Sequence, residues 1–186
     1  MRCWTCHEPV SGAVCVGCGA VQPPPAKPDP FAVLGLAPRY HVDAGEVDER
    51  YRALARQVHP DRFVSRPAVE RRMALQWTAA ANDARRVLKD PVRRAWQLAT
   101  GRPTPPERGA RLDPAFLAEM FELREADEEA PGSAAARAAE LRDELEAELD
   151  ALFTTWERGE GDLAQVEDRL SRLNYVADLA HGPRSP

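Results

Sequence analysis

Aromatic residues are scarce in this chain of 186 residues, because Trp, Tyr and Phe together make up only 6% of it. Runs of β-branched residues are also few, whereas Ala, Leu, Arg and Glu dominate the sequence. Strands favour β-branched and aromatic side chains, and helices favour the residues that are abundant here. The composition therefore predicts an all-α fold, and the length allows one medium domain or two small ones.

A long apolar run is missing too. No stretch approaches the roughly 20 apolar residues that cross a bilayer. Met1, Arg2 and Cys3 open the sequence without the apolar core of a signal peptide, and no Arg- and Ser-rich presequence precedes the first cysteine. We therefore expect a cytoplasmic protein that makes no contact with a membrane.

Several motifs of known chemistry are absent from the sequence. There is no Gly-rich loop to cradle a phosphate and no evident pair of nucleophile and base. Basic and aromatic residues do not alternate near the cysteines as they do in nucleic-acid binders. We expect a protein that is not an enzyme, and we disfavour a zinc ribbon that binds nucleic acid.

Charge is divided unevenly along the chain, whose formal net charge is -5. Residues 31–100 carry 13 Lys and Arg against 8 Asp and Glu, a net charge of +5. Residues 112–172 carry 6 against 18, a net charge of -12. This asymmetry indicates two modules with different partners, although two solvated helical surfaces would produce the same pattern.

All four cysteines fall within the first 18 residues, as Cys3-x-x-Cys6 and Cys15-x-x-Cys18. Two such pairs can supply four thiolates to one tetrahedral ion, and a site closed in this way is structural. So short a segment cannot build a hydrophobic core, so ligation would provide most of its folding free energy. We predict structural Zn²⁺, with rubredoxin-like iron or a redox dithiol as alternatives; a reducing cytosol disfavours disulfides. His7 could substitute as a ligand, but next to Cys6 we expect a bystander.

Two amphipathic helices are predicted on either side of residue 60. Asp43 can cap the first helix and Pro60 ends it. Apolar residues recur at helical spacing in both: Val47, Tyr51, Leu54 and Val58 in the first, and Met73, Trp77, Ala80, Ala84 and Val87 in the second. This pattern predicts two antiparallel helices, with His59, Pro60 and Asp61 where the loop between them begins.

This hairpin resembles the J-domain, by which co-chaperones activate the ATPase of DnaK-class chaperones. The flanking motifs are similar to those of HscB, the specialised co-chaperone family of iron–sulfur cluster assembly, over roughly residues 29–180. They are Asp29-Pro30-Phe31, Leu34-Gly35-Leu36, Tyr40, Arg50-Tyr51, His59-Pro60-Asp61-Arg62-Phe63, Asn82-Asp83-Ala84, Leu88-Lys89-Asp90-Pro91, Arg93-Arg94-Ala95, Phe116-Leu117, Glu122-Leu123-Arg124-Glu125 and Arg172-Leu173-Asn174-Tyr175. Some members of the family carry a similar tetracysteine extension.

The resemblance implies that the hairpin binds a DnaK/HscA-class ATPase. The residues it assigns to this contact are His59, Pro60, Asp61, Arg50, Arg52, Arg56 and Arg62. Pro60 would fix the loop backbone and Asp61 would offer an acceptor to a basic site, while the arginines would steer the domain toward an acidic surface. Alternatively, His59 ends a helix by binding a carbonyl of its last turn, and the arginines form a solvated face.

Three further helices with short loops predict an antiparallel bundle after residue 112. Phe116, Met120 and Leu123 share its first core stripe, so Leu117 and Phe121 point elsewhere. The resemblance implies that the bundle binds the cluster scaffold IscU through Leu117, Ala118, Phe121, Glu122, Glu125 and Tyr175. Ala118 replaces the larger Met usual in the family, and Asp178 stands where a Lys is common. Alternatively, Leu117 and Phe121 pack against other helices.

The predicted domains are a tetracysteine module (1–20), a Pro-rich linker (21–29), a J-domain (30–100), a second linker (101–112) and a three-helix bundle (113–181). The first linker should behave as a polyproline-type spacer, so we expect the module to be tethered rather than fused, with Trp4 able to dock it. The module is also a candidate for weak self-association. The alternative function is a general J-protein that holds unfolded clients with its zinc module and bundle.

Overall fold

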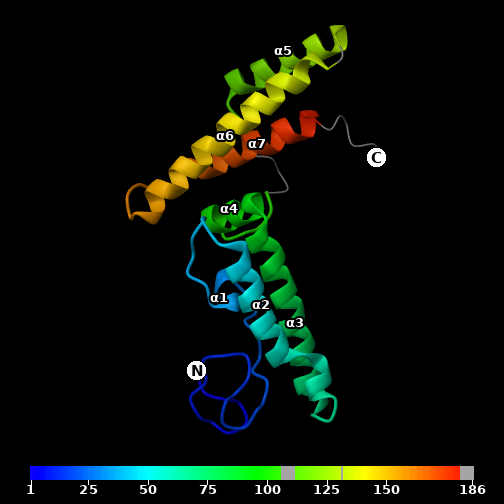
Figure 1. Cartoon of the computed structure of the whole chain (residues 1–186), viewed down its shortest axis with the longest axis vertical. Helices are drawn as coiled ribbons and strands as arrows, with labels where there is room; N and C mark the ends of the chain where they lie inside the picture. The colour runs from blue at the N-terminus through cyan, green and yellow to red at the C-terminus, as the bar shows by residue number, and fades with distance from the viewer. Residues whose placement is uncertain (106–111, 131, 181–186) are drawn as a thin grey trace. The chain divides into compact units, whose positions relative to one another are not determined.

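The computed structural model describes residues 1–105, 112–130 and 132–180, the last three as backbone only. The described residues form seven α-helices and one short 3₁₀ helix, with no strand beyond two isolated β-bridges near the N-terminus. They divide into two compact units (Figure 1). The first comprises Met1–Pro38 and Val42–Pro91, and the second comprises Arg39–His41 and the described residues from Val92 onward. The fold is all-α, as predicted.

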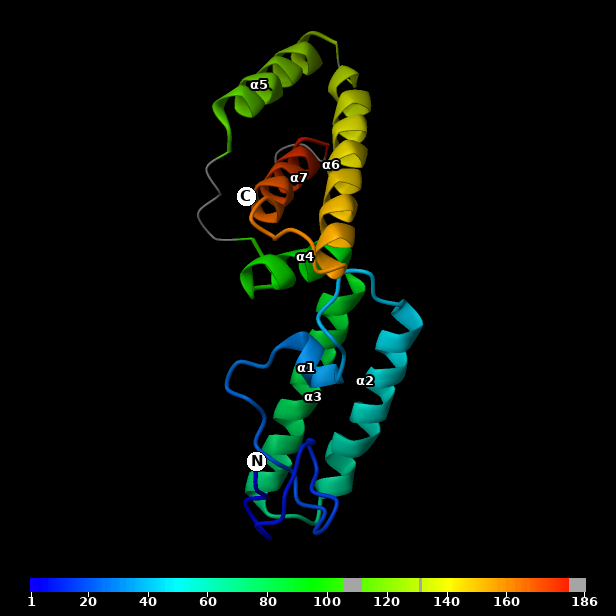
Figure 2. The same ribbon diagram turned by 90° about the vertical axis from the view of Figure 1, so that its left-hand side faces the viewer.

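The first unit is built on a helical hairpin. Its elements are α1 (Pro30–Leu34), α2 (Ala44–Val58), the 3₁₀ helix η1 (Pro60–Phe63) and α3 (Ala68–Lys89). Helices α2 and α3 run side by side in both views (Figures 1 and 2). Asp43 caps α2, because its carboxylate accepts a hydrogen bond from the Glu46 amide at 2.7 Å. The predicted stripes supply the core, with Val47, Val58 and Trp77 buried.

The second unit packs its helices around one apolar core. Its elements are α4 (Pro91–Thr100), α5 (Pro114–Glu129), α6 (Ser133–Glu157) and α7 (Val166–Ala180). The buried residues come from every one of these helices: Trp96, Phe116, Met120, Leu141, Leu145, Leu149, Phe153, Val166, Leu170, Leu173 and Val176. Helix α4, predicted as the last helix of the J-domain, thus buries its tryptophan with the carboxyl-terminal helices.

A short segment between α1 and α2 also joins this second core. The ring of Tyr40 stacks on that of Phe153, with centroids 4.1 Å apart and an interplanar angle of 10°. His41 follows, and its Nδ1 and Nε2 lie 2.8 Å from Glu157 and 2.9 Å from Asp150. These carboxylates raise the pKa of His41, the Asp150 hydrogen bond most of all. The segment is therefore anchored by stacking and by charge to α6.

The N-terminal segment is docked on α3, which differs from the predicted free tether. Val21 and Gln22, assigned to the linker, are 0% and 1% exposed. The Val21 amide donates to Oε2 of Glu70, and Nε1 of Trp77 donates to the Gln22 carbonyl at 2.7 Å. Trp4 makes its hydrogen bonds to Val21 and Gln22 rather than to α3. These contacts could not be predicted from local sequence patterns, because they join residues 49 and 55 positions apart.

Candidate functional site

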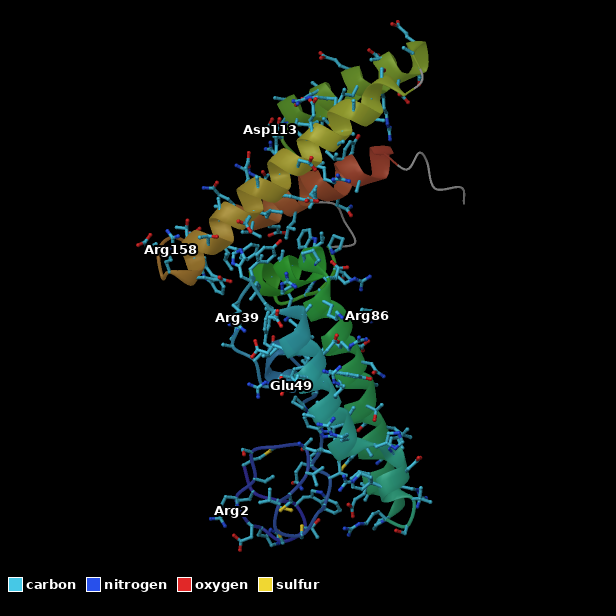
Figure 3. The ribbon with its side chains drawn as sticks, viewed as in Figure 1. Arg2, Arg39, Glu49, Arg86, Asp113 and Arg158 are labelled. Atoms are coloured by element: carbon cyan, nitrogen blue, oxygen red, sulfur yellow. The ribbon has the colours of Figure 1, made fainter. Side chains whose placement is uncertain are left out.

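The four cysteines form a compact cluster at the N-terminus. Their Sγ atoms all lie within 4.8 Å of one another, with 3.6 Å between Cys3 and Cys18 and 3.7 Å between Cys6 and Cys15. None of them forms a disulfide. Figure 3 shows the sulfur atoms of this segment gathered near the labelled Arg2. The structure thus brings together the four predicted ligands from two separate turns.

The two turns repeat one backbone pattern. The amide four residues after the first cysteine of each pair donates to that cysteine's carbonyl, from His7 to Cys3 at 3.0 Å and from Gly19 to Cys15 at 2.9 Å. Both donors have positive φ, 64° at His7 and 73° at Gly19. A left-handed backbone suits glycine and strains other residues. His7 therefore closes the first turn through its backbone, and it is not part of the sulfur cluster.

The cluster suits a zinc ion in geometry and in charge. Four sulfurs at the usual Zn–S distance of about 2.3 Å form a tetrahedron with edges of about 3.8 Å, close to the 3.6 Å and 3.7 Å separations of the two pairs given above. The Cys6 amide lowers the pKa of Cys3 to about 6. The Glu8 amide favours the Cys6 thiolate, but burial and the neighbouring thiols outweigh it and raise the pKa of Cys6 to about 12. A divalent cation would allow all four thiols to ionise together.

The predicted His-Pro-Asp loop lies at the end of the hairpin and is open to solvent. The side chains of His59 and Asp61 are 57% and 86% exposed. His59 is extended (φ -57°, ψ 127°), as expected before a proline, so α2 ends at Val58 and Pro60 begins the 3₁₀ helix. The ring Nδ1 accepts a hydrogen bond from the Asp61 amide at 3.3 Å. Phe63, only 4% exposed, anchors the loop in the hairpin core.

The four predicted arginines do not share one face. Arg52 and Arg56 are exposed and one turn apart on α2. Arg62 turns back, and its Nη1 donates to the Arg56 carbonyl at 3.1 Å, next to the end of α2. Arg50 lies on another side of α2, where it lines a cavity of about 620 Å³ together with α1 and the N-terminal segment. Arg56 and Arg62 therefore lie beside the His59 loop, Arg52 is exposed one turn further from it along α2, and Arg50 lines the cavity instead.

The predicted scaffold-binding residues of α5 lie on its outer side. Phe121 is 60% exposed, Ala118, Glu122 and Glu125 are exposed, and Leu117 is half-buried. Tyr175 of α7 differs from these residues because its ring is half-buried and packs on the core residue Phe116. The two rings meet edge to face, with centroids 6.1 Å apart. The α5 residues therefore form an apolar patch with an acidic rim. The side chain of Asp178, where the family commonly has a Lys, lies outside the described residues.

Comparison with known proteins decides the family. The co-chaperone protein HscB homolog of Bordetella pertussis is 43% identical over 160 residues, which cover 83% of this chain and 94% of that protein. The chain belongs to the HscB family of co-chaperones. Residues 112–182 also match the family model described as the HSCB C-terminal oligomerisation domain. The homolog from Cupriavidus taiwanensis is 39% identical over 162 residues, which cover 83% of this chain and 91% of that one.

Solved HscB structures share the fold. Human co-chaperone protein HscB matches with a TM-score of 0.77 and 25% identity, covering 97% of this chain and 95% of its own. HscB from Vibrio cholerae matches with a TM-score of 0.58 and 28% identity, covering 82% and 93%. Because 97% of this chain aligns with the human protein, most of the N-terminal segment lies within that match. The predicted family resemblance and fold class are confirmed.

Hydropathy adds one finding about the described residues. None of the helices they form is both long and apolar enough to cross a membrane.

Proposed function

We propose that this HscB-family chain stimulates the ATPase of a DnaK/HscA-class chaperone through its His59 loop. The observation that carries the proposal is the exposure of His59 and Asp61 on a loop whose base is fixed by buried Phe63. A rigid turn with exposed polar side chains is suited to recognition of a partner rather than to chemistry within this chain. Hydrolysis would take place in the chaperone, which must bind this loop better in its hydrolysing state.

The same proposal assigns delivery of an IscU-type iron–sulfur scaffold to the acidic-rimmed patch of Leu117, Ala118, Phe121, Glu122 and Glu125 on α5. An exposed aromatic ring beside carboxylates has the mixed character of a protein interface. Tyr175 stays a predicted contact, although its ring packs on Phe116. Cluster transfer would then require the scaffold and the chaperone to bind the chain together.

The proposal also includes a structural zinc ion, a cytoplasmic location and weak self-association. Cys3, Cys6, Cys15 and Cys18 would hold Zn²⁺, which would supply a structural cross-link between the two turns. A cytoplasmic location is tested by cell fractionation. Self-association through the N-terminal segment is tested by sedimentation of the full chain beside a variant that lacks residues 1–20, and equal behaviour of the two would contradict it.

Replacement of His59 tests the function. His59→Gln should abolish stimulation of single-turnover ATP hydrolysis by the chaperone without changing helicity or melting temperature, because the ring is exposed and packs against no core. Gln76→Ala, an exposed change on α3, is the matched control and should stimulate like the wild type. Full stimulation by His59→Gln would refute the proposed role of the loop.

A binding experiment separates scaffold delivery from general client holding. The scaffold model expects saturable binding of a folded IscU-type protein and no protection of an unfolded model client from aggregation. The opposite pair of results would support a general J-protein that holds unfolded clients.

A further inference from the structure

The N-terminal segment is joined to α3 by two buried hydrogen bonds. One runs from the Val21 amide to Oε2 of Glu70, at 3.3 Å, and the other from Nε1 of Trp77 to the Gln22 carbonyl. Glu70 is only 4% exposed, which is unusual for a carboxylate. Buried polar groups are costly when they lose their partners. The position of Val21 and Gln22 is therefore important for the first turns of α3.

Gln22 also contacts the sulfur cluster. Its Nε2 donates to Sγ of Cys3 at 3.3 Å and to the Ala20 carbonyl at 2.8 Å. The same residue thus touches a predicted metal ligand with its side chain and α3 with its main chain. A cavity of about 620 Å³ is lined by parts of the segment, by α1 and α2, and by Trp77 of α3. Both hydrogen bonds described above between the segment and the hairpin, Val21 to Glu70 and Trp77 to Gln22, are made with α3.

Glu70 is close in sequence to the His59 loop, and local backbone hydrogen bonds order the residues between them. The N-terminal segment lies at the same end of the hairpin as this loop in both views (Figures 1 and 2). A Cβ atom on Gly19 would lie 3.2 Å from Nη2 of Arg66, so this arginine reaches the second cysteine turn. Backbone hydrogen bonds of 3.0 Å each hold this stretch: the amides of Glu70, Arg66 and Arg62 donate to the carbonyls of Pro67, Phe63 and His59, respectively.

We propose that the four-cysteine module is a metal-dependent brace for the His59 loop, with Gln22 and Glu70 as its positioning residues. The inference rests on the chaperone-activating function proposed above. A segment this short keeps its fold through ligation, so loss of metal releases Val21 and Gln22. Glu70 and Trp77 then lose their partners, and the loop loses the support of the first turn of α3. Metal occupancy thereby controls how well the chain activates its chaperone.

Hydrogen exchange of the full chain tests the brace without any partner protein. Metal is removed with an organomercurial and a chelator, excess thiol reverses the mercurial, and metal analysis confirms the result. Exchange in residues 59–67 should rise by at least about fivefold, as expected for coupled sites, and added Zn²⁺ should restore it. Exchange in α6 and α7 should not change. Unchanged exchange in the loop would overturn the proposal.

Variants of Glu70 test the path while metal stays bound. Glu70→Ala removes the acceptor for the Val21 amide and should raise exchange in the loop, whereas Glu70→Gln retains an acceptor oxygen and should behave like the wild type. Gln76→Ala on the same helix is the matched control. If metal removal unfolds the whole chain, wild-type exchange in metal-bound Glu70→Ala would still overturn the brace.

Chaperone activation is measured beside the exchange experiment. The metal-bound wild type should stimulate ATP hydrolysis more strongly than Glu70→Ala. If the wild type itself fails to stimulate, the proposed function fails, and the exchange data still decide whether the brace exists. If the wild type and Glu70→Ala stimulate equally, the loop does not depend on the module.

Discussion

Replacement of Phe121 by alanine separates an interface role from a core role. A phenylalanine side chain has about 200 Å² to bury, so a ring that is 60% exposed offers about 120 Å² to a partner. At about 25 cal/mol per Å² that area sets an upper limit of about 3 kcal/mol, or roughly 100-fold in affinity for the scaffold, because the ordering of side chains on binding offsets part of it. The part already covered on α5 supports folding by no more than about 2 kcal/mol.

Calorimetric titration with an IscU-type scaffold, beside urea unfolding of each variant, is the assay. Leu75→Ala is the matched control, because Leu75 is 57% exposed on α3 and lies outside the patch. Phe116→Ala marks the core outcome, since this ring is 7% exposed and its loss should cost about 3–5 kcal/mol of stability. The reasoning fails if Phe121→Ala binds the scaffold like the wild type, or if it unfolds as readily as Phe116→Ala.

Metal analysis should find about one zinc per chain, and Cys15→Ser should lower this content and unfold the N-terminal segment without melting the helices; metal-free wild-type protein after gentle isolation would contradict the site. His7→Gly should remove the cost of about 1 kcal/mol that a side chain incurs in the left-handed backbone conformation of residue 7. The first cysteine turn would then be more stable, so zinc should pass more slowly to a competing chelator, and faster transfer would refute this. Because Asp150 and Glu157 raise the pKa of His41, its charged form stabilises the fold fully below the unfolded value of 6.5, and this contribution is lost as the pH rises through the folded pKa. The stability difference between wild type and His41→Gln, measured by urea unfolding, should therefore be largest below pH 6.5 and shrink as the pH rises above it, and a constant difference would contradict the charge assignment.

Much of the hairpin could be predicted from patterns among residues that are close in the sequence. The cap at Asp43 and the Val47 to Val58 stripe depend only on residues within a few turns, so their sequence pattern is direct. The same holds for Asp113, whose carboxylate accepts from the Ala115 amide at 2.7 Å at the start of α5. The cysteine pairs were equally readable, because their spacing reflects the geometry of one tetrahedral ion.

Long-range contacts were not readable in this way. Glu70 looks like any charged residue on a helix, and Gln22 looks like part of a Pro-rich spacer, yet both are buried where the N-terminal segment meets α3. Phe153 was missed as well, although it is 0% exposed. In the sequence of α6, residues Leu141, Leu145, Leu149, Leu152 and Trp156 recur at helical spacing, and this pattern indicates the buried side of the helix only approximately. Such contacts depend on which elements meet, and periodicity carries no information about that.

The stacking of Tyr40 on Phe153 has a consequence for the order of folding during synthesis. The partners are 113 positions apart, so a ribosome must add most of the chain after Tyr40 before its ring can be covered. Trp96 likewise cannot be buried until α6 and α7 have been synthesised, because residues of these helices form the core around it. At about 5–20 residues per second, both rings stay uncovered for several seconds or longer. The nascent chain of this co-chaperone therefore exposes aromatic side chains of the kind that chaperones bind.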